Sequence, residues 1–163
     1  MSRRRRLAGL LAVGLLTVAV AAACSGRPDH RTGAPLAMMK TGDELIVFIG
    51  KQCDDAGYPT RVRVANYDRD GQRVTDPPLW EIQASAPGLL PSVSLGRVPT
   101  GYTEVANNLG SQQVGATVKV DVKLAETVTA AFDTGRIVDG RVLESTGDLV
   151  SLESFRGTYG CGD

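Results

Sequence analysis

The chain has 163 residues, with 18 basic and 18 acidic side chains, one histidine and an aromatic content of 5%. This length suits one domain. The balanced charge leaves no basic footprint of the kind that nucleic-acid binding requires, so we expect no nucleic-acid partner.

Residues 1–23 have the three parts of an export signal. Arginines occupy positions 3–6, an apolar run extends from Leu7 to Val20, and three alanines precede Cys24. A positive head, an apolar centre and small residues before a cleavage point are typical of secretory signals. We therefore predict a signal peptide over residues 1–23.

The junction at Cys24 resembles that of a bacterial lipoprotein, although Ala21 stands where that family usually has a larger aliphatic residue. The bias toward arginine, alanine and glycine is similar to that of small actinobacterial lipoproteins. The resemblance implies that Cys24 is acylated, that the bond before it is cut, and that the lipid anchors the protein at the extracytoplasmic face of the membrane.

Two alternatives for the N-terminal segment stay open. One is an uncut membrane anchor, although Leu7–Ala23 has 17 residues interrupted by two glycines, and a spanning helix needs about 20 apolar residues. The other is a plain secretory signal that leaves Cys24 unmodified. The Ser2-Arg3-Arg4 start also leaves general or twin-arginine export undecided.

The chain has three cysteines, an odd number for an exported protein. Acylation of Cys24 leaves Cys53 and Cys161, which can form a disulfide in an oxidising compartment. Their separation of 108 positions is too wide for a metal knuckle or a Cys-x-x-Cys redox pair. We predict a structural disulfide.

Residues 24–42 are expected to form a tether. The segment after Cys24 is rich in polar residues, glycine and proline, includes the single histidine, His30, and has no apolar period. Such a composition buries too little surface to offset the entropy of ordering. Without residues 1–23, 14 basic and 18 acidic residues remain, a formal charge of −4.

From residue 43 the pattern has period two, which indicates half-buried strands. Thr117–Leu124 alternates polar and apolar residues throughout, Arg61–Val64 repeats this, and Glu44–Ile49 holds a continuous apolar run. Asp70-Gly71 and Asp139-Gly140 are hairpin signals. Further strands are expected at Leu79–Ala84, Ser92–Val98, Tyr102–Asn107, Val128–Phe132, Arg141–Leu143 and Leu149–Phe155.

No segment after the signal shows a helical period, and prolines separate the apolar runs. Short strands spaced by turns favour two packed antiparallel sheets. We predict an all-β domain over residues 43–163, a single immunoglobulin-like antiparallel β-sandwich, with a small β-barrel as the alternative.

The domain lacks the histidine that serine-histidine catalysis or histidine-ligated zinc would need. We therefore expect no catalytic residue and no cofactor, and Trp80, the only tryptophan, is expected in the core. The expected function is a non-catalytic envelope lipoprotein that binds an unidentified envelope protein or has a structural role.

A small-ligand or calcium-binding lipoprotein is the alternative function. Asn66, Asp68 and Asp70 have the spacing that opens a calcium loop of the EF-hand kind, but its twelfth position holds Pro77 in place of glutamate. A polar hairpin tip explains the same residues. We therefore predict no metal site, with these three residues as weak candidates.

Overall fold

The computed structural model describes residues 35–52, 57–68 and 73–160. The predicted signal peptide, most of the predicted tether, and the residues Cys24, His30, Cys53, Asp70 and Cys161 lie outside these ranges.

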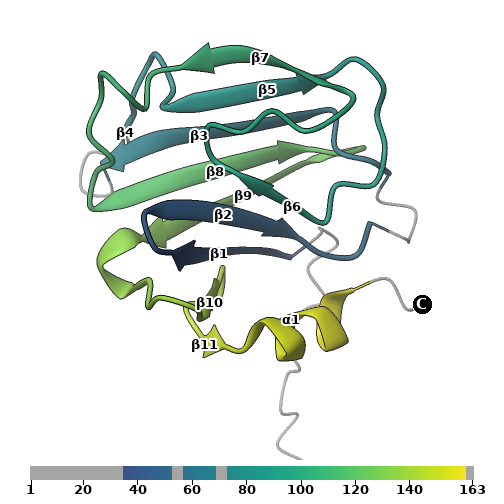
Figure 1. Ribbon diagram of the computed structural model, residues 1–163, viewed down its shortest axis with the longest axis vertical. Coiled ribbons are helices and arrows are strands. Elements are labelled where there is room, and N and C mark those ends of the chain that lie inside the picture. The colour runs from purple at the N-terminus through teal and green to yellow at the C-terminus, as the bar shows by residue number, and fades with distance from the viewer. Residues whose placement is uncertain (1–34, 53–56, 69–72, 161–163) are drawn as a thin grey trace, which may run out of the picture. The chain divides into compact units, whose positions relative to one another are not determined.

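Two antiparallel sheets form the domain (Figure 1). The first has the order β11-β10-β1-β2-β6, with bounds β1 (Leu36–Thr41), β2 (Glu44–Ile49), β6 (Ser92–Ser94), β10 (Val142–Glu144) and β11 (Leu149–Val150). The second has the order β7-β5-β3-β8-β9, with bounds β3 (Arg61–Asp68), β5 (Trp80–Ala84), β7 (Tyr102–Asn107), β8 (Thr117–Lys123) and β9 (Thr127–Asp133). A short strand, β4 (Arg73–Val74), pairs with the end of β3.

This arrangement confirms the predicted β-sandwich. Neither strand path closes on itself among the described residues, so the barrel alternative is wrong. The spatial orders β1-β2-β6 and β5-β3-β8-β9 correspond to strands A-B-E and C′-C-F-G of an immunoglobulin-like sandwich, except that the chain forms β7 beside β5 between β6 and β8. The β10–β11 hairpin extends the first sheet at β1, and β7 extends the second at β5.

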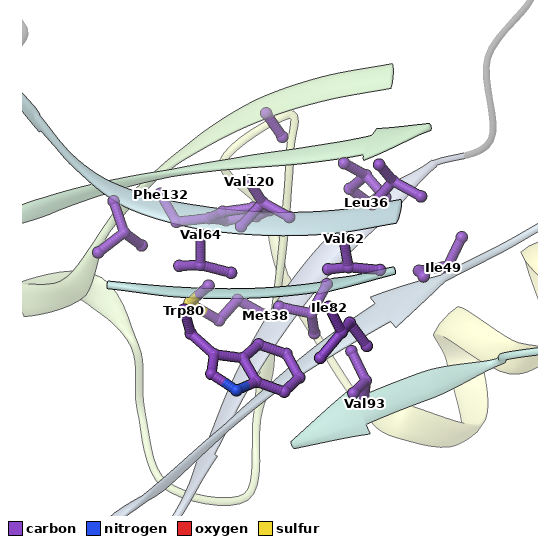
Figure 2. Close-up of a cluster of buried hydrophobic side chains, with 14 of the residues drawn as sticks. Leu36, Met38, Ile49, Val62, Val64, Trp80, Ile82, Val93, Val120 and Phe132 are labelled. Atoms are coloured by element: carbon purple, nitrogen blue, oxygen red, sulfur yellow. The ribbon is translucent and has the colours of Figure 1, made fainter. Parts of the chain in front are cut away.

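The core lies between the sheets and follows from the alternating pattern of the strands (Figure 2). Val62 and Val64 of β3 lie opposite Val122 and Val120 of β8, and all four are fully buried. Each such side chain contributes about 1.5–3 kcal/mol on burial. Trp80 is also fully buried, which confirms its expected place in the core, and its indole N–H donates to Glu104 Oε2 at 3.2 Å.

The sandwich begins earlier than predicted, because β1 occupies residues assigned to the tether. This strand has no polar alternation, since both of its faces are covered. Leu36 and Met38 join the core between the sheets, whereas Ala37 and Met39 join a second cluster on the outer side of the first sheet. A strand buried on both faces resembles an unpatterned apolar segment in sequence.

The prediction of a helix-free domain, with a strand over Leu149–Phe155, is wrong. Within that predicted strand, only Leu149–Val150 is extended, as β11. An α-helix, α1 (Leu152–Tyr159), follows β11 after one residue. A 3₁₀ turn also occupies Thr134–Arg136, after β9. The hydroxyl of Ser151 accepts the backbone N–H of Ser154 at 3.0 Å and caps α1.

Helix α1 covers the outer side of the first sheet. Phe155 is buried in the cluster that contains Ala37, Met39 and Phe48, with its ring 6.0 Å from that of Phe48.

No helix in the described part of the chain is long and apolar enough to cross a membrane. The predicted strand at Ser92–Val98 is also shorter than expected, since Gly96 turns the chain at φ +80°.

Candidate functional site

The outer face of the second sheet gathers basic side chains from two strands that are distant in sequence. Strands β3 and β8 pair antiparallel, and their register places Arg61 opposite Lys123 and Arg63 opposite Asp121. Because successive residues of a strand point to opposite faces, the valines between these residues enter the core and the charged side chains face outward.

Strands β3, β8 and β9 are neighbours in the second sheet (Figure 1). A shallow concavity of about 500 Å³ lies over the side chains on their outer face. We call its lining the basic face, which consists of Arg61, Arg63, Lys119, Asp121, Lys123, Thr127 and Thr129. Thr127 lies opposite Lys123 and Thr129 opposite Asp121, so the face is a regular array of paired positions.

Glu81 of β5 holds the two arginines side by side. Its carboxylate is only 7% exposed; Oε1 accepts from Arg61 Nη2 at 2.7 Å and from Nε at 2.9 Å, whereas Oε2 lies 3.4 Å from Arg63 Nε. A guanidinium has five N–H donors, so each arginine keeps further donors after these contacts. The buried glutamate therefore orients two cations without using all of their hydrogen-bonding capacity.

Asp121 interacts with Lys119 and Thr129 rather than with Lys123. Its Oδ1 lies 3.2 Å from Lys119 Nζ and accepts the Thr129 hydroxyl at 2.6 Å. For Lys123 Nζ, the contact found within the described ranges is the carbonyl oxygen of Ala125 at 3.4 Å.

The basic face therefore has an excess of positive charge. The lining has four cations and one carboxylate, Asp121, and Glu81 on the neighbouring strand β5 adds a second carboxylate, which leaves a formal charge of +2. Asp76 approaches Arg63 at 3.4 Å, but its side chain is 87% exposed, so solvent weakens this pair. The local excess is opposite in sign to the −4 of the chain after residue 23.

Sequence reasoning missed this group as a site. The alternation in Arg61–Val64 and Thr117–Leu124 correctly predicts, for each strand separately, that the charged residues point away from the core. What it cannot give is the pairing of β3 with β8, because strands β4, β5, β6 and β7 lie between them in the chain. No basic run occurs at either position.

The weak calcium candidates do not form a ligand set among the described residues. Asn66 Oδ1 accepts the backbone N–H of Gly115 at 2.7 Å, and its Nδ2 donates to the carbonyl of Gln113 at 2.9 Å. Asn66 thus fixes the loop before β8. Asp68 is exposed at the end of β3, and Asp70 lies outside the described residues. Within those residues no group of three or more His, Cys, Asp or Glu side chains could hold a metal ion.

Three titratable groups with shifted pKa values lie away from the basic face. Burial raises the pKa of Tyr102, whose hydroxyl donates to the carbonyl of Pro59 at 2.6 Å. Burial also raises the pKa of Glu144 and of Tyr159, and the negative charges of Glu144 and Asp148 raise that of Tyr159 further.

Comparison with known proteins gives no relative from which a site could be transferred to this chain. No protein-family model matches the chain, and no curated protein or solved structure shows significant similarity to it.

Proposed function

We propose that the chain is an exported lipoprotein whose non-catalytic β-sandwich binds a protein partner of the cell envelope through the basic face. In this proposal the acylated Cys24 anchors the protein at the extracytoplasmic face of the membrane.

The N-terminal sequence supports the anchor. Its arginines, apolar run and small residues before Cys24 fit an acylated export signal. Two or three acyl chains, each of many methylene groups at about 0.8 kcal/mol, would hold the mature protein firmly at the membrane.

The single observation that supports the binding role is the excess of positive charge on the basic face. Four cations gather around one concavity on an otherwise acidic chain, and strands of a rigid sheet hold their backbones in place. Charge complementarity of this kind favours fast and selective association with an oppositely charged partner.

Cys24→Ser tests the anchor. We expect this variant to remain unprocessed and to lose labelling by a radioactive fatty acid. Unchanged labelling would overturn the lipoprotein assignment.

A photo-crosslinking residue at Thr129 tests the binding face in intact cells, with the same residue at the half-exposed Val138 as a matched control. We expect a specific adduct from position 129 alone, which disappears when Lys119→Glu and Lys123→Glu are combined and persists with Lys40→Glu. Equal adducts from both positions, or an adduct insensitive to the double charge reversal, would refute the assignment.

A further inference from the structure

The pair Arg61 and Lys123 places two positive charges directly opposite each other on adjacent strands. Like charges at opposed positions destabilise a sheet. Glu81 neutralises the charge of Arg61 through two short contacts. For the Lys123 ammonium, the contact found in the described part of the chain is one long hydrogen bond to a carbonyl oxygen. The repulsion between Arg61 and Lys123 is therefore only partly compensated within the protein, and an anion bound at this position would reduce it.

The two arginines of the basic face repeat at the spacing of alternate residues in an extended chain. Arg61 and Arg63 are two positions apart on β3, which corresponds to roughly 6.6–6.8 Å. Lys119 and Lys123 are four positions apart on β8, with Asp121 between them on the same face. The side chains on one face of an extended peptide repeat at the same distance as the two arginines. Alternate carboxylates of such a peptide therefore match the spacing of Arg61 and Arg63, and a carboxylate at Arg61 also lies near Lys123 on the opposite strand.

The remaining lining residues favour a peptide over a sugar or nucleotide. Thr127 offers a hydroxyl beside the cations, whereas the Thr129 hydroxyl donates to Asp121. Among the described residues the lining has no aromatic ring on which a sugar or a base could stack. Arginines whose guanidiniums are already oriented by Glu81 suit carboxylates, which they can bind in a fork-like geometry.

We infer that the basic face binds an extended acidic segment of its protein partner, with acidic side chains at alternate positions. This inference rests on the proposed function, since it names the chemistry of the partner at the same face. Carboxylates of the segment pair with Arg61, Arg63 and Lys123, and Lys119 exchanges part of its contact with Asp121 for the ligand.

Binding of defined peptides to the full chain in a non-ionic detergent tests the inference. The probes are a fluorescent nine-residue peptide alternating Glu and Thr, its counterpart with Gln for each Glu, a block peptide with the same Glu residues consecutive, and an oligophosphate of equal charge. Anisotropy is measured at about 20 mM and about 300 mM salt, because salt screens exposed charges.

The alternating acidic peptide should bind roughly tenfold more tightly than the other three probes, and less tightly at the higher salt concentration. The double variant Lys119→Gln/Lys123→Gln should lose roughly tenfold in affinity, whereas Lys40→Gln in the first sheet should lose none. A circular dichroism melt of each variant shows that the fold is retained.

Equal binding of the glutamine peptide, equal binding of the block peptide, or tighter binding of the oligophosphate would each overturn the inference. If the crosslink from position 129 depends on Lys119 and Lys123 but the alternating peptide does not bind, the inference fails and the proposed function stands. Loss of that crosslink dependence would instead refute the proposed function itself.

Discussion

The backbone N–H of Lys51 donates to the carbonyl oxygen of Tyr159 at 2.7 Å, which joins the segment after β2 to the end of α1. Beside this bond, the N–H of Gly50 donates to the carbonyl of Pro35 at 2.9 Å. Two distant parts of the chain, one before β1 and one after the last strand, therefore meet at residues 50 and 51.

This junction makes a disulfide between Cys53 and Cys161 feasible. Both cysteines lie outside the described residues, each two positions beyond a member of the Lys51–Tyr159 pair. A segment of two residues spans at most about 7 Å, so each cysteine must lie within about 7 Å of the Lys51–Tyr159 contact. A disulfide needs a Cα separation of roughly 4.4–6.8 Å, which two segments of this length can reach. We predict that exported protein has no free thiol at these positions, as intact mass after alkylation would show.

Cys161→Ser should then lower the free energy of unfolding by about 2–4 kcal/mol and the melting temperature by several degrees. Cys53→Ser and the double variant Cys53→Ser/Cys161→Ser are the matched comparisons, because each removes the same bridge and should lower the stability to a similar extent. Alkylation of both Cys53 and Cys161 in unreduced exported protein would contradict the prediction.

A second prediction concerns the close approach at Gly50. A Cβ at this position would lie 2.7 Å from Cβ of Tyr159 and 2.8 Å from Cγ of Pro35, so Gly50→Ala must move backbone on one side. We expect a loss of about 1–3 kcal/mol in stability, measured by urea unfolding.

Gly157→Ala is a matched control, for which we expect a gain in stability rather than a loss. Gly157 lies within α1 and a Cβ there would meet nothing within 4 Å, so alanine should stabilise by about 0.5–1 kcal/mol through its helix propensity. If the two substitutions had equal effects, the packing at residue 50 would not be the cause.

The third prediction separates stability from binding on the basic face. Lys123→Gln removes the charge opposite Arg61 but keeps a long polar side chain. We expect the variant to gain about 0.2–1 kcal/mol in stability and to bind the alternating acidic peptide more weakly. Thermal melts and peptide titrations of the same preparation measure both, and a variant that lost stability would show that Lys123 has a structural role instead.

The alternating strands were predictable from sequence because each has one face in the core and one in solvent. Thr117–Lys123 appears almost as predicted for this reason. The strand Tyr102–Asn107 also lies where it was predicted, although Tyr102 is its one buried residue. Strand β1 was not predictable, because α1 covers its outer face and removes the polar alternation. The helix itself has only two turns, and its apolar positions at Leu152, Phe155 and Tyr159 become recognisable once Phe48 is known to face them.

The basic face could not be predicted from the sequence for a different reason. Each of its cations is visible in the sequence as the outward residue of an alternating strand, yet the site depends on which strands are neighbours. In the observed register of β3 and β8, Val62 and Val64 lie opposite Val122 and Val120, and all four belong to the core between the sheets. Such long-range pairing is a property of the whole core, which a local pattern does not contain.

The last prediction uses the raised pKa of Glu144 on β10. Burial is the largest cause, and the charge of Asp148 adds to it, whereas the hydrogen bond from the Thr146 hydroxyl opposes it. That hydroxyl lies 3.4 Å from Glu144 Oε2 and 2.9 Å from Asp148 Oδ2, so one donor serves two carboxylates. Folding therefore favours the protonated form of Glu144.

The sign of the pH dependence follows from this direction. A carboxyl whose pKa is higher in the folded than in the unfolded protein stabilises the fold below its unfolded pKa, about 4.3, and this contribution is lost as pH rises through the folded pKa. Glu144→Gln keeps the neutral form at every pH. The variant should thus melt at a higher temperature than the native chain at pH 7–8, and the difference should disappear near pH 4.

Thr146→Val provides the complementary test, because it removes the hydrogen bond that lowers the pKa of Glu144. In a ¹³C titration of the Glu144 carboxyl, the midpoint of the variant should lie above that of the native chain, which itself should lie above the ordinary value for glutamate. A native midpoint at or below that value, or a Glu144→Gln variant that melts at a lower temperature at pH 8, would show that this carboxylate is stabilised in its charged form.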